Sequence, residues 1–139
     1  MNTYPNIPTQ SHPFYLVFQL GIQIQHLGQK LETETGISLT QWSILKQLID
    51  HPASSALSLA HSVGVQPSTL TQALKRLEKK ELIYLGKDPS DSRKKMLSLT
   101  RTGKTALDRA DLWLQTKLHE LKSGPEEIQS LWEQLLRIS

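Results

Sequence analysis

The sequence predicts a mainly α-helical fold that contains one small β-hairpin. Hydrophobic residues recur every three or four positions over most of the chain, which is the spacing of one helix face. Two short apolar runs, 82–85 and 96–100, break this pattern and flank a charged, turn-forming segment at 86–95. With 139 residues, of which 37% are hydrophobic, the chain can form one compact domain with an ordinary core.

A long first helix is predicted to end at Gly36, because glycine readily adopts the left-handed conformation that follows a helix. Its apolar stripe consists of Val17, Leu20, Ile24, Leu27 and Leu31. Residues 1–12 are proline-containing and are expected to form an extended arm.

Two shorter helices are predicted next. Thr40 is expected to cap the first of them, which ends before Pro52. Its inner face is expected to consist of Trp42, Leu45, Leu48 and Ile49. Ser54 or Ser55 is expected to cap the other, and Gly64 suits the left-handed position after it.

A fourth helix is predicted to begin at Pro67, because the first turn of a helix does not use the missing backbone N–H. Leu70, Leu74 and Leu77 are expected to face inward. The residues left outside are polar or basic: Ser68, Thr71, Gln72, Lys75, Arg76 and Lys79.

Two further helices follow the hairpin. The apolar stripe of the fifth consists of Leu107, Ala110, Leu114, Leu118 and Leu121. Ser123 and Glu126 have the spacing of a capping box for the last helix. The apolar stripe of that helix consists of Ile128, Leu131, Leu135 and Ile138.

From Leu57 to Gly103 the predicted order is therefore helix, tight turn, second helix and charged hairpin. This is the order of parts in a winged helix-turn-helix, in which the second helix enters the major groove of DNA and the hairpin reaches the neighbouring minor groove. The charge distribution favours the same interpretation. Residues 66–109 carry eleven basic and five acidic side chains, whereas residues 1–65 and 110–139 have net charges of −1 and −2.

The sequence disfavours several other classes of protein. The chain has no cysteine, which excludes disulfides and thiolate metal sites and fits a cytoplasmic protein. No basic residue precedes Lys30 and the early apolar runs are short, so a signal peptide or membrane span is not expected. The five histidines lack metal-ligand spacing, and no nucleophile elbow, phosphate-binding glycine loop or dinucleotide fingerprint occurs. We therefore expect no enzyme activity, no metal and no cofactor.

The first helix and the last two each carry a continuous apolar stripe, although the whole helix-turn-helix separates them in sequence. A chain of this size has too little core to cover all three stripes, so we expect a homodimer formed by these helices. The alternative is an intramolecular bundle without a dimer. We divide the chain into an arm and first dimerisation helix (1–36), a DNA-binding region (37–103) and C-terminal dimerisation helices (104–139), intertwined as one domain.

Several motifs resemble those of the multiple-antibiotic-resistance regulator (MarR) family. They are LTQW at 39–42, VQPSTLT at 65–71, LEKK at 77–80, DPSDSR at 88–93 and LSLTRTG at 97–103. The D-x-R and L-x-L-T wing pattern is more specific than the helix-turn-helix itself. The resemblance implies a dimeric winged-helix regulator, usually a repressor, that binds a palindromic operator and leaves it when a small, often aromatic, ligand binds.

The resemblance assigns DNA contacts to the predicted second helix of the motif. Gln66 and Ser68 lie at its N-terminus, and Thr71 and Gln72 follow one turn later. Gln72 can pair with an adenine edge, whereas the family commonly has arginine there. Arg76 is expected to contact a phosphate, and Lys75 is a further expected DNA contact. Plain solvation of the helix is the alternative for this group.

In the hairpin, Arg93 resembles the family arginine that enters the minor groove, and Asp91 is expected to pair with it or with a base. Lys94 and Lys95 are expected to add electrostatic affinity. Asp91 can instead be an ordinary turn residue. Glu81 departs from the family pattern, because it stands where glycine is usual, and a left-handed conformation there would cost about 1 kcal/mol.

The resemblance also implies a ligand pocket between the first, second and fifth helices, and Tyr15, His26, Trp42 and Trp113 are its candidates. Trp42 and Trp113 can equally be ordinary core residues. The function predicted overall is that of a sequence-specific DNA-binding regulator. The alternative is a winged-helix protein-interaction module that does not bind DNA.

Overall fold

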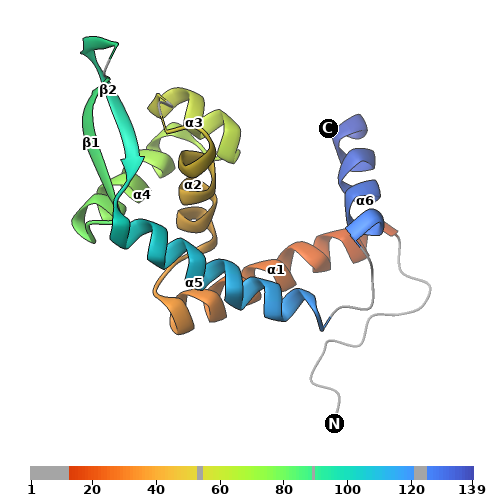
Figure 1. The fold of residues 1–139 in the computed structure, drawn as a ribbon. Coiled ribbons are helices and arrows are strands. Elements are labelled where there is room, and N and C mark those ends of the chain that lie inside the picture. The colour runs from red at the N-terminus through yellow and green to blue at the C-terminus, as the bar shows by residue number, and fades with distance from the viewer. Residues whose placement is uncertain (1–12, 53–54, 89, 121–124) are drawn as a thin grey trace.

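The computed structural model describes residues 13–52, 55–88, 90–120 and 125–139. The predicted arm, Ser54, Leu121 and Ser123 lie outside these ranges. The elements are α1 (Pro13–Thr35), α2 (Leu39–Asp50), α3 (Ala56–Val63), α4 (Pro67–Lys79), β1 (Ile83–Asp88), β2 (Asp91–Leu99), α5 (Arg101–Leu118) and α6 (Pro125–Ile138). The predicted fold class, mainly α with a β-hairpin wing, is confirmed (Figure 1).

Helix α2 lies at the centre of the molecule. It packs against α1, α3, α4, α5 and β2, so it joins the helix-turn-helix to the long helices α1 and α5. The core around it is built almost entirely from aliphatic side chains, and Leu31, Ile44, Leu45, Leu70 and Leu107 are each 1% exposed or less. Burial of this continuous core is the main force that holds the helices together.

The N-terminal cap of α2 differs from the prediction. Ser38, and not Thr40, is the cap, because its hydroxyl accepts a hydrogen bond from the Gln41 backbone N–H at 3.1 Å. The Gln41 side chain accepts one in return from the Ser38 N–H, which completes a capping box. Ile49 was expected on the inner face of α2, but it is exposed, and Ile44 is the residue that is buried there.

The helix-turn-helix is formed by α3 and α4, which pack against each other. Ser55 caps α3 as predicted by accepting a hydrogen bond from the Ser58 N–H. Gly64 has a φ of 80° and ends α3 in the left-handed conformation, as expected from its position. Pro67 then opens α4, which directs Leu70, Ala73 and Leu77 into the core.

The hairpin is longer than predicted. The ladder continues beyond the apolar runs to Lys87 opposite Lys95, with an irregularity between Lys87 and Asp88. The segment 86–95 was expected to be a turn because it is charged. An antiparallel ribbon tolerates charged side chains when they point into water, so the backbone remains paired through most of this segment.

Among the residues that the structure describes, no helix has the length and apolar character needed to cross a membrane.

Candidate nucleic-acid interface

The outer face of α4 is formed by polar and basic side chains. Gln66, just before the helix, is exposed, and so are the predicted contact residues within it, namely Ser68, Thr71, Gln72, Lys75 and Arg76. This exposure follows from the buried stripe of Leu70, Ala73 and Leu77, because side chains between those positions point to the opposite side of the helix. The face is therefore available to a partner.

Among the described residues, no side chain caps or neutralises the N-terminus of α4. Gln66 is the N-cap residue, but its side chain makes no capping hydrogen bond, and the first turn contains no acidic residue. The free backbone N–H groups and the helix dipole at such an end favour an anion. A DNA phosphate is one anion that suits this position.

The basic side chains of α4 are not neutralised by neighbours. Within the described ranges, the ion pairs found are Lys46–Asp111, Arg93–Asp91 and Lys117–Glu120, none of which involves α4. Lys80, just after the helix, is used differently, since its ammonium group donates to the Gly36 carbonyl oxygen at 2.9 Å. The helix carries three basic residues, Lys75, Arg76 and Lys79, against one acidic residue, Glu78, so its net charge is positive.

The hairpin projects from the same end of the molecule (Figure 1). Arg93 is 94% exposed, and its Nε lies 4.0 Å from Asp91 Oδ1. The same carboxylate oxygen accepts a hydrogen bond from the Arg93 backbone N–H at 3.0 Å. Asp91 therefore both shapes the turn and pairs with Arg93. The two roles that the sequence offered as alternatives, a turn residue and a partner of Arg93, occur together. Lys94 and Lys95 follow in β2, and Lys95 is exposed.

The turn after α4 keeps the left-handed geometry for which glycine is usual. Glu81 has a φ of 60°, and its backbone carbonyl accepts a hydrogen bond from the Thr100 hydroxyl at 2.6 Å. The chain thus retains the turn despite the unfavourable residue. The wing stays in place relative to α5 because Thr100 ties the two segments together.

The four candidate ligand residues are distributed over three helices. Tyr15 and His26 are exposed on α1, whereas Trp42 on α2 and Trp113 on α5 are partly buried against the core. None of the four lines the pocket between Phe14 and α6 or the pocket beside α3. The burial of Trp42 and Trp113 against the core is consistent with the alternative that both are ordinary core residues.

Sequence reasoning missed the interaction that holds Trp42. The indole Nε1 donates to Asp111 Oδ1 at 2.7 Å, and Lys46 Nζ lies 3.2 Å from Asp111 Oδ2. These contacts tie α2 to α5. The partners are 69 and 65 positions apart, so no local spacing could have revealed them.

Comparison with known proteins shows the family to which this chain belongs. The MarR family model matches residues 37–95. A curated relative, the uncharacterized HTH-type transcriptional regulator YxaD of Bacillus subtilis, is 30% identical over 81% of this chain and 79% of its own length. The chain belongs to the MarR family. It is a helix-turn-helix transcriptional regulator, and this membership favours DNA binding over the protein-interaction alternative.

Other relatives agree with this assignment. The HTH-type transcriptional repressor NicR of Pseudomonas putida is 27% identical over 88% of this chain and 81% of its own length. Among solved structures, the repressor CouR bound to a 23-mer DNA duplex superposes with a TM-score of 0.77, at 21% identity, over 96% of this chain and 99% of CouR. CouR from Rhodococcus jostii has also been solved with p-coumaroyl-CoA, with a TM-score of 0.77 at 20% identity, over 93% of this chain and 94% of CouR. The relatives named here are regulators and not enzymes.

Proposed function

We propose that this chain is a homodimeric repressor that binds a palindromic operator in the cytoplasm and has no catalytic activity. The observation that carries the proposal is the net positive outer face of α4, whose basic side chains form no ion pair in the described structure, together with a hairpin whose Arg93 is 94% exposed. A recognition helix in the major groove and an arginine in the minor groove would use these two features. The proposed DNA contacts are Gln66, Ser68, Thr71, Gln72, Lys75, Arg76, Asp91, Arg93, Lys94 and Lys95.

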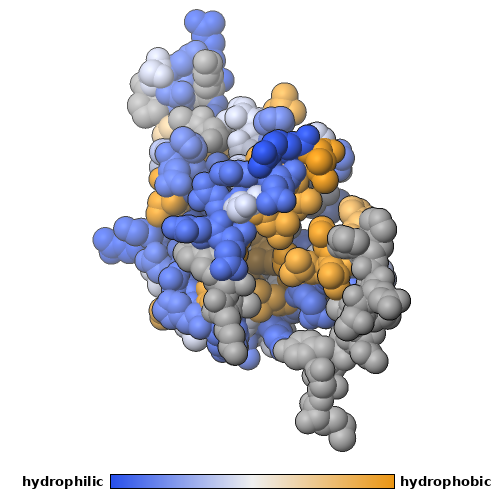
Figure 2. Space-filling model, turned by 90° about the vertical axis from the view of Figure 1, so that its right-hand side faces the viewer, coloured by the Kyte–Doolittle hydropathy of each residue, from blue (hydrophilic) through white to orange (hydrophobic). Residues whose placement is uncertain are grey.

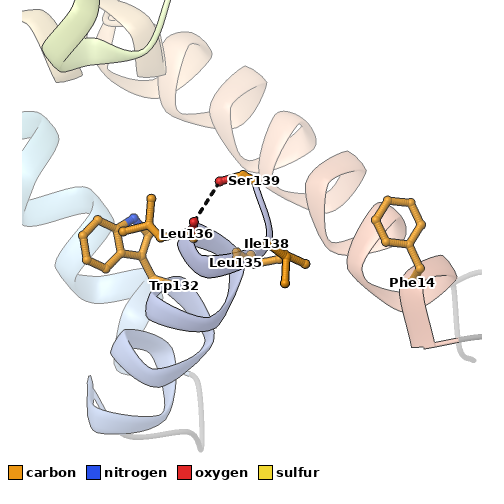
Figure 3. A pocket seen from close by; sticks show the side chains of 6 residues that line it. All are labelled: Phe14, Trp132, Leu135, Leu136, Ile138 and Ser139. Carbon is orange, nitrogen blue, oxygen red and sulfur yellow. Dashed lines mark hydrogen bonds between the residues drawn. The ribbon is translucent and has the colours of Figure 1, made fainter.

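A dimer is proposed because large apolar side chains remain uncovered on α1, α5 and α6. Phe18, Leu112 and Trp132 are 57%, 70% and 59% exposed. Figure 2 shows hydrophobic surface gathered on one face of the molecule, and Figure 3 shows Phe14 of α1 and the apolar side chains of α6 on opposite sides of a pocket of about 420 Å³. A two-fold dimer would cover such surface and present two recognition helices about one DNA turn apart.

The proposed effector is a small aromatic molecule. The support comes from CouR, whose fold is similar and which was solved with p-coumaroyl-CoA. Tyr15, His26, Trp42 and Trp113 remain the proposed ligand residues. A ligand that displaces the Trp42 indole would break its hydrogen bond to Asp111. Because the hydrogen bond between Trp42 and Asp111 joins α2 to α5, its loss would alter the position of the helix-turn-helix.

The salt dependence of binding tests the proposed function. A palindromic duplex is selected from a random pool with the full-length protein, and its affinity is measured over a range of salt concentrations. Each phosphate neutralised adds roughly 0.9 to the negative slope of log K against log salt, so we expect a slope of several units. An affinity that does not respond to salt would favour the protein-interaction alternative.

Arg93→Ala tests the role of the hairpin. We expect a loss of roughly tenfold or more in operator affinity, measured by gel-shift titration, because the groove loses an inserted guanidinium. Dimerisation should be unchanged, since the Arg93 side chain is almost fully exposed. Unchanged operator affinity would contradict the assignment of Arg93.

A further inference from the structure

The outer face of α4 is divided into an uncharged half and a basic half. Residues 67–74 contain no charged side chain, and the first basic residue of the helix is Lys75. Arg76 and Lys79 continue the basic half to the end of the helix, and Glu78 is the one acidic residue in it. In a helix-turn-helix, the N-terminal residues of the recognition helix contact base edges, so the uncharged half is the one that reads sequence.

This division limits which bases the helix can read. Guanine is read most often by a bidentate contact from arginine or lysine to its O6 and N7 atoms. The uncharged half of α4 contains no arginine or lysine. The exposed side chains that remain there are short hydroxyls and one amide.

Gln72 lies near the centre of the outward face. It is one turn after Ser68 and one turn before Lys75 and Arg76, on the side opposite the buried Leu70 and Leu77. Its side chain is exposed, and the described part of the structure gives it no hydrogen-bond partner. A glutamine amide in this position can accept from adenine N6 and donate to adenine N7 at the same time.

The hydroxyl group of the neighbouring Thr71 already makes a hydrogen bond within the helix. Its Oγ1 donates to the Pro67 carbonyl oxygen at 2.9 Å, so its proton is not available to a base acceptor. Thr71 is exposed next to Gln72, and its methyl group takes no part in that hydrogen bond. Apolar contact of a threonine methyl with the 5-methyl group of thymine is a recognised major-groove contact.

We infer that each operator half-site carries an A·T block beneath the N-terminal half of α4, and that Gln72 is the residue that selects its adenine. The inference rests on the proposed function, because it requires α4 to lie in the major groove. Lys75 and Arg76 then hold the helix on the phosphates without distinguishing between sequences.

The test uses the full-length protein and the duplex that it selects from a random pool. Single adenines of the half-site are replaced in turn by 7-deazaadenine, which removes the N7 acceptor and leaves base pairing intact. For the wild type we expect one adenine per half-site at which this replacement weakens binding by roughly 5- to 150-fold. Gln72→Ala should lose that sensitivity while remaining folded, because its side chain is exposed.

Two further variants sharpen the test. Gln72→Arg should change the preferred base pair at this position from A·T to G·C in a new selection. Lys75→Ala, the matched control, should weaken binding to all duplexes by a similar factor and retain the adenine preference. If the wild type selects no duplex at all, the proposed function fails; if it selects one and Gln72→Ala retains the same sensitivity to 7-deazaadenine, only the inference about Gln72 fails.

Discussion

At the scale of single residues, Glu81 occupies a conformation that suits glycine. It is the one non-glycine residue with positive φ in the described part of the chain. Its side chain is exposed, so the conformation is imposed by its surroundings, through the Thr100 hydroxyl on the Glu81 carbonyl and the packing of Leu82. Local strain of this kind persists when neighbouring contacts determine the backbone.

Glu81→Gly should therefore stabilise the protein. Removal of the Cβ clash in the left-handed region should raise the free energy of unfolding by roughly 1 kcal/mol, measured by urea denaturation. Glu81→Ala is the control, because it removes the carboxylate but keeps the Cβ atom. Equal effects of the two substitutions would show that charge, and not backbone conformation, is responsible.

Gly103 is required for a close approach between the start of α5 and the wing. A Cβ atom at this position would lie 1.9 Å from the Leu82 carbonyl oxygen, which also accepts a hydrogen bond from the Thr100 N–H. Gly103→Ala should lower the free energy of unfolding by about 1–3 kcal/mol, because backbone must move. The exposed neighbour Thr102→Ala should change it by no more than about 0.5 kcal/mol, and similar losses for both would contradict this account.

At the scale of the elements, α2 and α5 are joined by polar contacts as well as by the core. Asp111 accepts from the indole N–H of Trp42 and from the ammonium group of Lys46. The ion pair is about 40% exposed, with side-chain values of 43% and 36%, so it contributes little by itself. The partly buried indole N–H depends more on its acceptor.

Asp111→Ala should lower the free energy of unfolding by about 1–2 kcal/mol in thermal or urea unfolding, because Trp42 loses its acceptor. Asp111→Asn retains a side-chain oxygen and should lose less. Asp108→Ala serves as the control, since Asp108 is exposed on the same helix. A loss at Asp108 as large as that at Asp111 would refute a specific role for the contact.

At the scale of the whole molecule, the basic side chains and the exposed apolar side chains are concentrated on different elements. Helix α4 and the hairpin carry a dense group of basic side chains, whereas most of the large exposed hydrophobics lie on α1, α5 and α6. Helix α2 connects the two regions by packing against α1, α4, α5 and β2. A change at the apolar end can therefore be transmitted to the basic end through a shared element.

Leu112→Asp should weaken the proposed dimer, because a carboxylate would be buried in an apolar interface. A penalty of about 2 kcal/mol or more corresponds to a rise of roughly 30-fold in the dimer dissociation constant, measurable by sedimentation equilibrium. Leu57→Asp is the matched control, since Leu57 is 73% exposed on α3, away from the predicted interface. A wild-type monomer, or equal effects of both substitutions, would disprove the assignment of these helices.

The sequence alone determined the helices, the hairpin and the concentration of positive charge, because helical spacing and net charge are local properties that need no knowledge of distant partners. It also predicted which side of α4 faces solvent. The tertiary structure decided that Ser38 caps α2, that the hairpin ladder continues through a charged segment, and that Trp42 is held by Asp111. These features depend on which distant groups meet when the chain folds, and the choice among several nearby polar partners is made by packing.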